Sequence, residues 1–468
     1  MYSLHDIEVT NISVKKVLDC EIKSEIGEHS SFTITAFVDQ EDFLQTTPDC
    51  QDIEIWLNGE DGKKRIFSGI VTGIQVSESG QVETVQIQGK SRSWLMDRTK
   101  RCRTFQDSKM SYQALVKEIL ADYGGSSLVY AGSNEAIGTL IVQYDETDWD
   151  FLQRVLSRIG LMLTPESRED GIKLYAGIPA FPKTELTYSI LEMEKDMEAY
   201  YSLKANGRKV HAADFTQYLV SSGQLLGIFA STVAEGQQLS VYRYRYSFES
   251  QDMVGYYRLQ GKKGLKSEAV YPMHLIGVAL SGKVVKVSGS NIQAAMEIDG
   301  GNAKKRASFW FPYSTLSAST DGSGWYCMPE KGDDVRIYFP SKQEGEAIAL
   351  SAVSNYDAPK DGGEDRMQDP NSRYLKSKSG QELALAPDYM KLSCGKSKSA
   401  VTIQTDGKII IQAEAMVTAM AKEEIKLYAE ENLNIHVQES ASISSIKGGM
   451  IVLGEGKAGI YGTEVKYD

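Results

Sequence analysis

The sequence predicts a mainly β protein of several domains that ends in an intertwined β-helix of three chains. Length, composition and a C-terminal repeat support this fold class. The chain has 468 residues, which is more than one hydrophobic core usually serves, so we expect three or four domains. It contains 25 Tyr and only 11 Pro, a balance that is typical of a protein built mostly from strands.

Charge and hydropathy exclude several classes of protein. The formal net charge is −12, whereas a general nucleic-acid binder needs a surplus of Lys and Arg. We therefore expect no nucleic acid among its partners. No stretch approaches the roughly 18 continuous apolar residues that span a bilayer. Residues 1–6 lack the basic and apolar regions of a secretion signal, so we expect synthesis in the cytoplasm.

The cysteines do not form a recognisable metal site. They are scattered and never form a C-x-x-C pair, so we expect free, buried thiols at Cys20, Cys50, Cys102, Cys327 and Cys394. A zinc site needs ligands clustered at short spacing, and the sequence contains no such cluster. We expect neither a metal nor any other cofactor.

An eight-residue repeat of apolar side chains runs through the last hundred residues in two lanes. The first lane contains Val401, Ile409, Val417, Ile425, Leu433 and Ala441, and the second contains Ile403, Ile411, Ala419, Leu427, Ile435, Ile443 and Ile451. With 41% hydrophobic residues, chance would make all of these positions apolar roughly once in 10⁵ sequences. Residues two apart point to one face of a strand. Each octad therefore predicts a short strand with two inward side chains, followed by a polar turn.

A single ribbon of this kind cannot bury its apolar face, and its open strand edges would attract other chains. Three copies wound around a common axis would bury both lanes and pair every edge. We therefore predict a homotrimeric spike over residues 374–468. Its core would contain Val401, Ile403, Ile409, Ile411, Ile425, Leu427, Leu433, Ile435, Ile443 and Ile451. The alternative is a single-chain β-solenoid, although solenoid coils need more than eight residues.

Short strands separated by turns precede the repeat. We expect them at Val278–Val287, Ala307–Phe311, Val335–Phe339 and Ala347–Val353. About five strands in roughly 80 residues fit a small Greek-key barrel of the OB type. OB barrels often bind oligonucleotides through aromatic and basic residues, and residues 304–311 contain both. Because the barrel precedes the predicted spike directly, we expect it to act as a collar instead.

Residues 143–156, QYDETDWDFLQRVL, predict the start of an amphipathic helix. Thr147 is placed to cap this helix, and Asp150 is placed to complete a capping box. The apolar stripe contains Phe151, Leu152, Val155, Leu156 and Ile159 at helical spacing. The carboxylates Asp145, Glu146, Asp148 and Asp150 could form an acid–base cluster. Acidic residues in a first helical turn usually stabilise the helix dipole without doing chemistry, and we expect that role here.

Several segments resemble the family of VgrG spikes of type VI secretion systems and phage late-control proteins. Residues 143–156 followed by Gly160 resemble the hub segment of this family, and Phe67–Gly73 resembles one of its hub strands. Gly324–Val335 resembles its Gly-Trp pattern followed by Pro-Glu-x-Gly-Asp. The octad repeat resembles its triple-stranded β-helix. The resemblance covers nearly the whole chain in the order hub, collar, β-helix.

The resemblance implies four regions. Residues 1–268 would form a tail hub of two β-barrel domains with inserted helices, and residues 269–356 would form the OB-fold collar. Residues 357–373, rich in Gly, Asp and Pro, would be a linker. Residues 374–468 would form the triple-stranded β-helix spike.

The resemblance also implies a function. The homotrimer would nucleate the inner tube of a contractile injection system and puncture the target cell envelope. The system could be a phage tail, a tailocin, an extracellular injection system or a type VI apparatus. The expected partners are further copies of the chain, the inner tube protein, baseplate proteins, a PAAR-type tip protein and the target envelope. The protein would assemble at the baseplate and reach the target cell surface.

Two other functions compete with this one. A spike-borne peptidoglycan hydrolase would need a catalytic domain, and residues 357–373 are too short to hold one. The motifs H-E-x-x-H and G-x-S-x-G are also absent, so we expect no enzyme. A receptor-binding tail fibre can also use a trimeric β-helix. Fibres rarely begin with the pattern found at residues 144–160.

Overall fold

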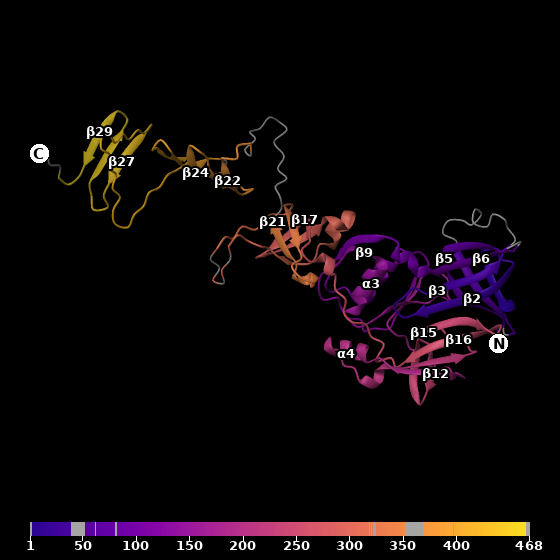
Figure 1. The fold of residues 1–468 in the computed structure, drawn as a ribbon. Helices are drawn as coiled ribbons and strands as arrows, with labels where there is room; N and C mark the ends of the chain where they lie inside the picture. The colour runs from indigo at the N-terminus through magenta and orange to yellow at the C-terminus, as the bar shows by residue number, and fades with distance from the viewer. Residues whose placement is uncertain are drawn as a thin grey trace. The chain divides into compact units, whose positions relative to one another are not determined.

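The computed structural model describes residues 2–38, 52–60, 62–79, 82–317, 319, 321, 324–351, 368–395 and 397–464. Two compact units divide the chain, Met1–Ser354 and Asn355–Asp468, and each is described by itself (Figure 1). Strands dominate both units, as the composition predicted. Across the described ranges, no helix has the length and apolar character needed to cross a membrane.

The first unit is built on an antiparallel sheet of 11 strands that forms a nearly closed barrel. In spatial order these are β1 (Ile7–Thr10), β4 (Asp52–Gly59), β5 (Gly62–Ser79), β6 (Val82–Ser91), β3 (Ser31–Phe37), β2 (Lys16–Glu25), β15 (Gln237–Glu249), β16 (Asp252–Gln260), β13 (Thr216–Ser222) and β12 (Ser189–Lys195), with β14 (Ser231–Ala234) paired to β15. Alternation of apolar and polar residues sets the inner face. In β3, for example, Phe32, Ile34 and Ala36 are buried and their neighbours are not.

Strands β2 and β15 join the two halves of this sheet and lie side by side in Figure 1. Their register runs from Glu25 opposite Arg243 to Ile22 opposite Tyr246. More than 200 residues separate the two strands in sequence, so strands β1–β6 and strands β13–β16 share one hydrophobic core.

Helices and short strands are inserted between β6 and β12. They comprise η2 (Arg92–Asp97), β7 (Lys100–Phe105), α2 (Tyr112–Leu120), β8 (Ser127–Tyr130), β9 (Ile141–Thr147), α3 (Asp148–Ser157), β10 (Leu163–Pro165) and β11 (Lys173–Ala176). Strand β7 pairs with β9, and β8, β10 and β11 form a sheet of three. The apolar faces of α2 and α3 meet in a separate core, in which Leu115, Phe151 and Val155 are fully buried.

A five-stranded sheet follows in the order β19 (Phe311–Pro312), β18 (Asn291–Met296), β17 (Ala279–Ser288), β20 (Asp334–Tyr338) and β21 (Ile348–Ser351). A bridge between Tyr313 and Ala349 connects its two edges. Its core also takes in Leu140 and Val142, which lie at β9. The five-stranded sheet is therefore packed directly on the strand that precedes α3.

The remaining helical segments of the first unit are short. They are η1 (Leu4–Asp6), α4 (Met197–Ala205), η3 (Ala212–Phe215), η4 (Met273–Leu275), η5 (Glu297–Asn302), α5 (Ala303–Arg306) and η6 (Glu344–Glu346). Helix α4 buries only Leu203 among its nine residues.

The second unit contains two antiparallel meanders. The first consists of β22 (Arg373–Lys376), β23 (Glu382–Leu385), β24 (Tyr389–Cys394), β25 (Ser399–Gln404) and β26 (Ile409–Ala413). The second consists of β27 (Ser440–Ser444), β28 (Met450–Gly454) and β29 (Lys457–Tyr461). Gly407, with φ of +88°, lies in the turn between β25 and β26, where the sequence predicted a turn.

Some local expectations need correction. The strand expected at residues 307–311 is reduced to β19, because residues 307–310 form no regular structure, and the strand β18 was missed. Cys20 is a free, buried thiol, but Cys102, Cys327 and Cys394 are exposed, so burial was wrongly expected for these three. Cys50 and residues 357–367 of the predicted linker lie outside the described residues.

Candidate functional site

Helix α3 is the centre of the segment that the sequence singled out. The predicted cap at Thr147 forms, because its hydroxyl accepts a hydrogen bond of 3.1 Å from the Asp150 N–H. The return hydrogen bond to the Asp150 side chain, which would complete the capping box, is not among the contacts described for this helix. The apolar stripe faces the core, with Phe151 and Val155 fully buried. Helix α2 is capped in the same way by Ser111, which accepts a 3.2 Å hydrogen bond from the Ala114 N–H.

A buried ionic cluster connects α3 to the five-stranded sheet. The Arg154 guanidinium donates to Glu146 at 2.7 Å and to Glu344 at 3.1 Å, and Arg158 also donates to Glu344. The Arg154 and Glu344 side chains are only 3% and 1% exposed, so neither charge can be stabilised by water. Burial disfavours the Arg154 charge, but hydrogen bonds and charge from Glu146 and Glu344 outweigh it and raise the pKa of the guanidinium.

A second buried carboxylate lies at the start of the same helix. Asp148 is fully buried and accepts hydrogen bonds from Arg103, from Gln143 at 2.9 Å and from the Tyr123 hydroxyl at 2.8 Å. Burial and the Asp148 charge together raise the pKa of Tyr123, so its hydroxyl stays a donor. The hydrogen bonds to this carboxylate therefore connect β7, β9 and the segment after α2 to α3.

A third polar contact connects β7 to the five-stranded sheet. Buried Asp299 accepts two hydrogen bonds from Thr104, one from the backbone N–H at 2.6 Å and one from the hydroxyl at 2.5 Å. Arg306 donates to the Thr104 carbonyl and to Glu118 on α2. We name the set of buried polar contacts made by Glu344 and Asp299 the joint, because both residues belong to the five-stranded sheet region and their partners belong to the inserted helices and strands.

The structure places only part of the acidic run in the first turn of α3. Asp148 and Asp150 lie there, as expected, whereas Asp145 and Glu146 belong to β9. Glu146 and Asp148 are buried in ion pairs, and Asp145 pairs with Lys100 at 2.9 Å. Glu344 was missed, because nothing in its local sequence marks it as a partner of Arg154.

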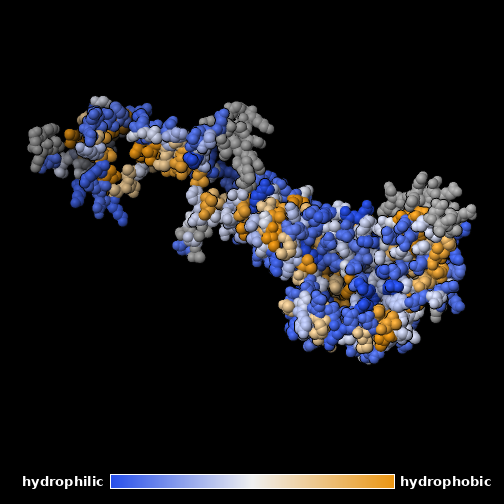
Figure 2. Space-filling model, in the orientation of Figure 1, coloured by the Kyte–Doolittle hydropathy of each residue, from blue (hydrophilic) through white to orange (hydrophobic). Residues whose placement is uncertain are grey.

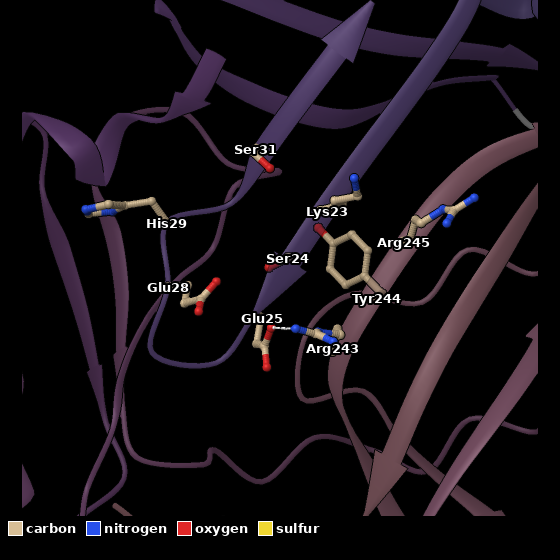
Figure 3. A pocket seen from close by; sticks show the side chains of 9 residues that line it. All are labelled: Lys23, Ser24, Glu25, Glu28, His29, Ser31, Arg243, Tyr244 and Arg245. Carbon is tan, nitrogen blue, oxygen red and sulfur yellow. Dashed lines mark hydrogen bonds and ion pairs between the residues drawn. The ribbon is translucent and has the colours of Figure 1, made fainter. Parts of the chain in front are cut away.

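A polar pocket of about 370 Å³ lies beside the seam between β2 and β15 (Figure 3). Its lining residues are Lys23, Ser24, Glu25, Glu28, His29, Ser31, Arg243, Tyr244 and Arg245. The cations in it already have acidic partners. Arg243 donates to Glu25 at 2.6 Å, and Arg245 lies 3.0 Å from Glu21. The pocket is therefore bordered by internal ion pairs of the sheet seam.

The ten residues predicted to form a spike core are all exposed in the single chain, with Ile409 67% and Leu427 72% accessible. Figure 2 shows hydrophobic side chains on the surface of the second unit. The structure brings some of them together. Val401 lies opposite Ile411, Ile403 opposite Ile409, and Ile443 opposite Ile451. The other four, Ile425, Leu427, Leu433 and Ile435, lie between β26 and β27 and belong to no strand.

The part of the chain that the structure describes contains no cluster of three or more His, Cys, Asp or Glu side chains that could hold a metal ion. His436, the last histidine of the sequence, is exposed in the segment between β26 and β27.

Comparison with known proteins relates the first unit to tail hubs. Residues 23–187 match the family described as phage tail baseplate hub. The type VI secretion system spike protein VgrG1b of Pseudomonas aeruginosa is 35% identical over 103 residues, and VgrG1c of the same organism is 33% identical over 102 residues. These matches span 22% and 21% of this chain but only 14% of each relative.

Solved structures show the same fold at low sequence identity. The E. coli c3393 protein, a type VI secretion component described as similar to the T4 phage tail proteins gp27 and gp5, aligns with a TM-score of 0.56 at 14% identity and covers 74% of this chain and 99% of its own. A Francisella PdpA–VgrG complex aligns with a TM-score of 0.51 at 12% identity, over 87% of this chain and 79% of that chain. The chain is thus similar to phage tail baseplate hubs over residues 23–187 and to VgrG spike proteins over about a fifth of its length.

Proposed function

We propose that this protein is the homotrimeric hub and spike of a contractile injection system. The observation that carries the proposal is the exposed apolar surface of the second unit, which continues a chain whose first unit has the baseplate-hub fold. Soluble monomers rarely leave such an apolar surface uncovered. Two further copies would cover it, because the eight-residue repeat presents the same side chains from each copy to a common axis.

The first unit would serve as the hub and the second as the spike. Residues 1–268 would nucleate the inner tube, residues 269–356 would form the OB-type collar, and residues 374–468 would form the triple-stranded β-helix. Contraction of an outer sheath would drive the tube forward, and the spike would concentrate that force on a small area of envelope. Inner tube protein, baseplate proteins and a PAAR-type tip protein are the proposed partners.

The joint fits this role mechanically. A force that passes from a hub to a spike must cross the contact between the inserted helices and the five-stranded sheet. That contact contains buried charge pairs, and removal of one partner from such a pair costs about 3–5 kcal/mol. It also shares apolar core residues from β9. We propose a structural role and no enzymatic activity.

The mass of the protein in solution tests the proposal most directly. Three chains of 51.8 kDa would give a homotrimer of about 155 kDa by light scattering. A monodisperse particle of one chain would contradict the spike and most of the mechanism. Deletion of Lys376–Asp468 provides a second test. The first unit should stay folded, since it is a compact unit with its own cores, while trimer stability and injection should be lost. Injection by the truncated particle would contradict the role of the spike.

A further inference from the structure

His29 occupies a buried position between three segments of the first unit. It lies in the turn between β2 and β3, and its ring packs on Trp149 of α3 with centroids 4.1 Å apart. Its Nδ1 is 2.8 Å from the Ser93 hydroxyl of η2. The side chain is only 8% exposed. Gln153 of α3 also reaches this turn and donates a 2.6 Å hydrogen bond to the Gly27 carbonyl. The turn is therefore docked against both η2 and α3.

The second ring nitrogen of His29 has no hydrogen-bond partner. Its Nε2 is buried and lies 3.7 Å from an Asp97 carboxylate oxygen, which is beyond hydrogen-bond distance. The other oxygen of Asp97 accepts a 2.8 Å hydrogen bond from the Thr147 hydroxyl. Thr147 in turn caps α3. One carboxylate thus lies between a buried imidazole and the N-terminal cap of the helix.

We propose that His29, Asp97 and Thr147 form an acid-sensitive relay that controls the docking of α3 on the barrel. At neutral pH the imidazole is uncharged and Asp97 is free to hold the Thr147 hydroxyl. A proton added at Nε2 creates a buried cation that faces Asp97. The carboxylate is then attracted away from Thr147, and the charged ring is drawn towards water, which loosens both the cap and the packing on Trp149.

The charged groups around His29 determine how the stability of the docked state changes with pH. Burial lowers the pKa of His29 to about 4, with Asp97 opposing this change and Lys90 of β6 supporting it. Glu28 flanks His29 in the turn, and Asp150 lies on the first turn of α3. Burial and the nearby Asp97 charge raise the pKa of Asp150, so acid also reduces the negative charge around the relay. A histidine with a depressed pKa makes the docked state less stable as pH falls below its ordinary value of 6.5.

The relay would also affect the joint, because both act on α3. Helix α3 contains Arg154 and is followed by Arg158 at its C-cap, and both arginines bind Glu344. Loosening of its first turn would therefore reach the contact with the five-stranded sheet. This inference goes beyond the proposed hub-and-spike function, because it concerns the conformational stability of the first unit alone.

Hydrogen–deuterium exchange of the full-length protein, corrected for the intrinsic effect of pH, tests the relay. In the wild type, exchange over residues 27–31, 92–98 and 147–158 should accelerate by on the order of tenfold or more between about pH 6.5 and pH 4.5. His29→Gln keeps a hydrogen-bonding group but cannot take up the proton, so its profile over these segments should be nearly flat. His5→Gln, at an exposed histidine, is the control and should follow the wild type.

Asp97→Asn keeps the test decisive if His29→Gln does not fold. Asparagine can still accept from Thr147, but it no longer stabilises the imidazolium. The acid response of residues 27–31 should therefore be at least as large as in the wild type, because the docked state tolerates the proton even less well. The response of residues 147–150 should be smaller, because the neutral side chain is not drawn away from Thr147. Either a wild-type profile in His29→Gln or an undiminished response of residues 147–150 in Asp97→Asn would overturn the proposal. Equal acceleration across the whole first unit would also overturn it, because it would indicate global acid unfolding without a relay.

Discussion

Arg154 and Glu344 lie 190 positions apart in the chain and meet in a buried ion pair, with Nη1 3.1 Å from Oε1. Arg154 comes from the helix that the sequence identified, whereas Glu344 comes from η6, which precedes β21 of the five-stranded sheet. The pair makes the hub fold and the following sheet depend on each other for stability.

Glu344→Gln should destabilise the first unit strongly. The change removes the only carboxylate that contacts both Arg154 and Arg158 among the contacts that the structure describes. Loss of one partner from a buried pair costs about 3–5 kcal/mol, and the retained amide should place this variant near the lower value. Urea unfolding measures the change. Glu346→Gln, at an exposed neighbour, should alter stability by no more than about 0.5 kcal/mol, and equal effects of both changes would contradict the joint.

Thr147→Ala should weaken the start of α3. The variant loses the oxygen that accepts the Asp150 N–H and the hydroxyl that donates to Asp97. Loss of an N-cap usually costs about 1 kcal/mol in the free energy of unfolding. Thr147→Ser keeps both hydrogen bonds and should stay close to the wild type. If the two variants had the same thermal midpoint, the cap would contribute nothing measurable.

The cap of α3 could be predicted from sequence because its partner lies three residues away. The Thr147 hydroxyl accepts from the Asp150 N–H, as that spacing indicated. The ionic partner of Arg154 could not be predicted, because an ion pair between distant segments leaves no trace in local spacing. The pairing of β2 with β15 could not be predicted either, because the two strands lie far apart in sequence and meet only in the folded sheet.

The octad repeat made one prediction that the single chain confirms and one that the single chain cannot test. It predicted strands and a turn around Asp406, and β25 and β26 flank that turn. It also predicted a buried core, which one chain cannot supply. Ile409 and Leu427 are exposed in the single chain, so the trimeric core remains a prediction.

Glu166→Gln should remove part of the acid sensitivity of the barrel. Burial opposes the charge of Glu166, but hydrogen bonds and charge from Arg168 hold the pKa of the carboxyl below its ordinary value of 4.5. A depressed carboxyl pKa gives stability that is complete above the ordinary value and is lost as pH falls through the lower, folded value. The variant should thus be less stable than the wild type at neutral pH, and the difference should shrink below about pH 4.5.

Urea unfolding at several pH values measures this difference. Glu169→Gln is a matched control on an adjacent segment, because the Glu169 side chain is 65% exposed. Its stability should parallel that of the wild type at every pH. A constant gap between Glu166→Gln and the wild type down to about pH 3 would contradict the assigned pKa direction.

Leu427→Asp should open the proposed spike, whereas Lys426→Asp should leave it intact. In the trimer, Leu427 would face the three-fold axis and meet two copies of itself, so the change would bury three like charges, each costing several kcal/mol. Alternation along a strand directs the neighbouring residue outward. In the single chain the Lys426 side chain is 78% exposed and pairs with Glu424 at 2.7 Å. Trimer mass after heating in detergent is the measurement. Loss of the trimer in Lys426→Asp, with Leu427→Asp unaffected, would show that the two lanes are displaced by one residue.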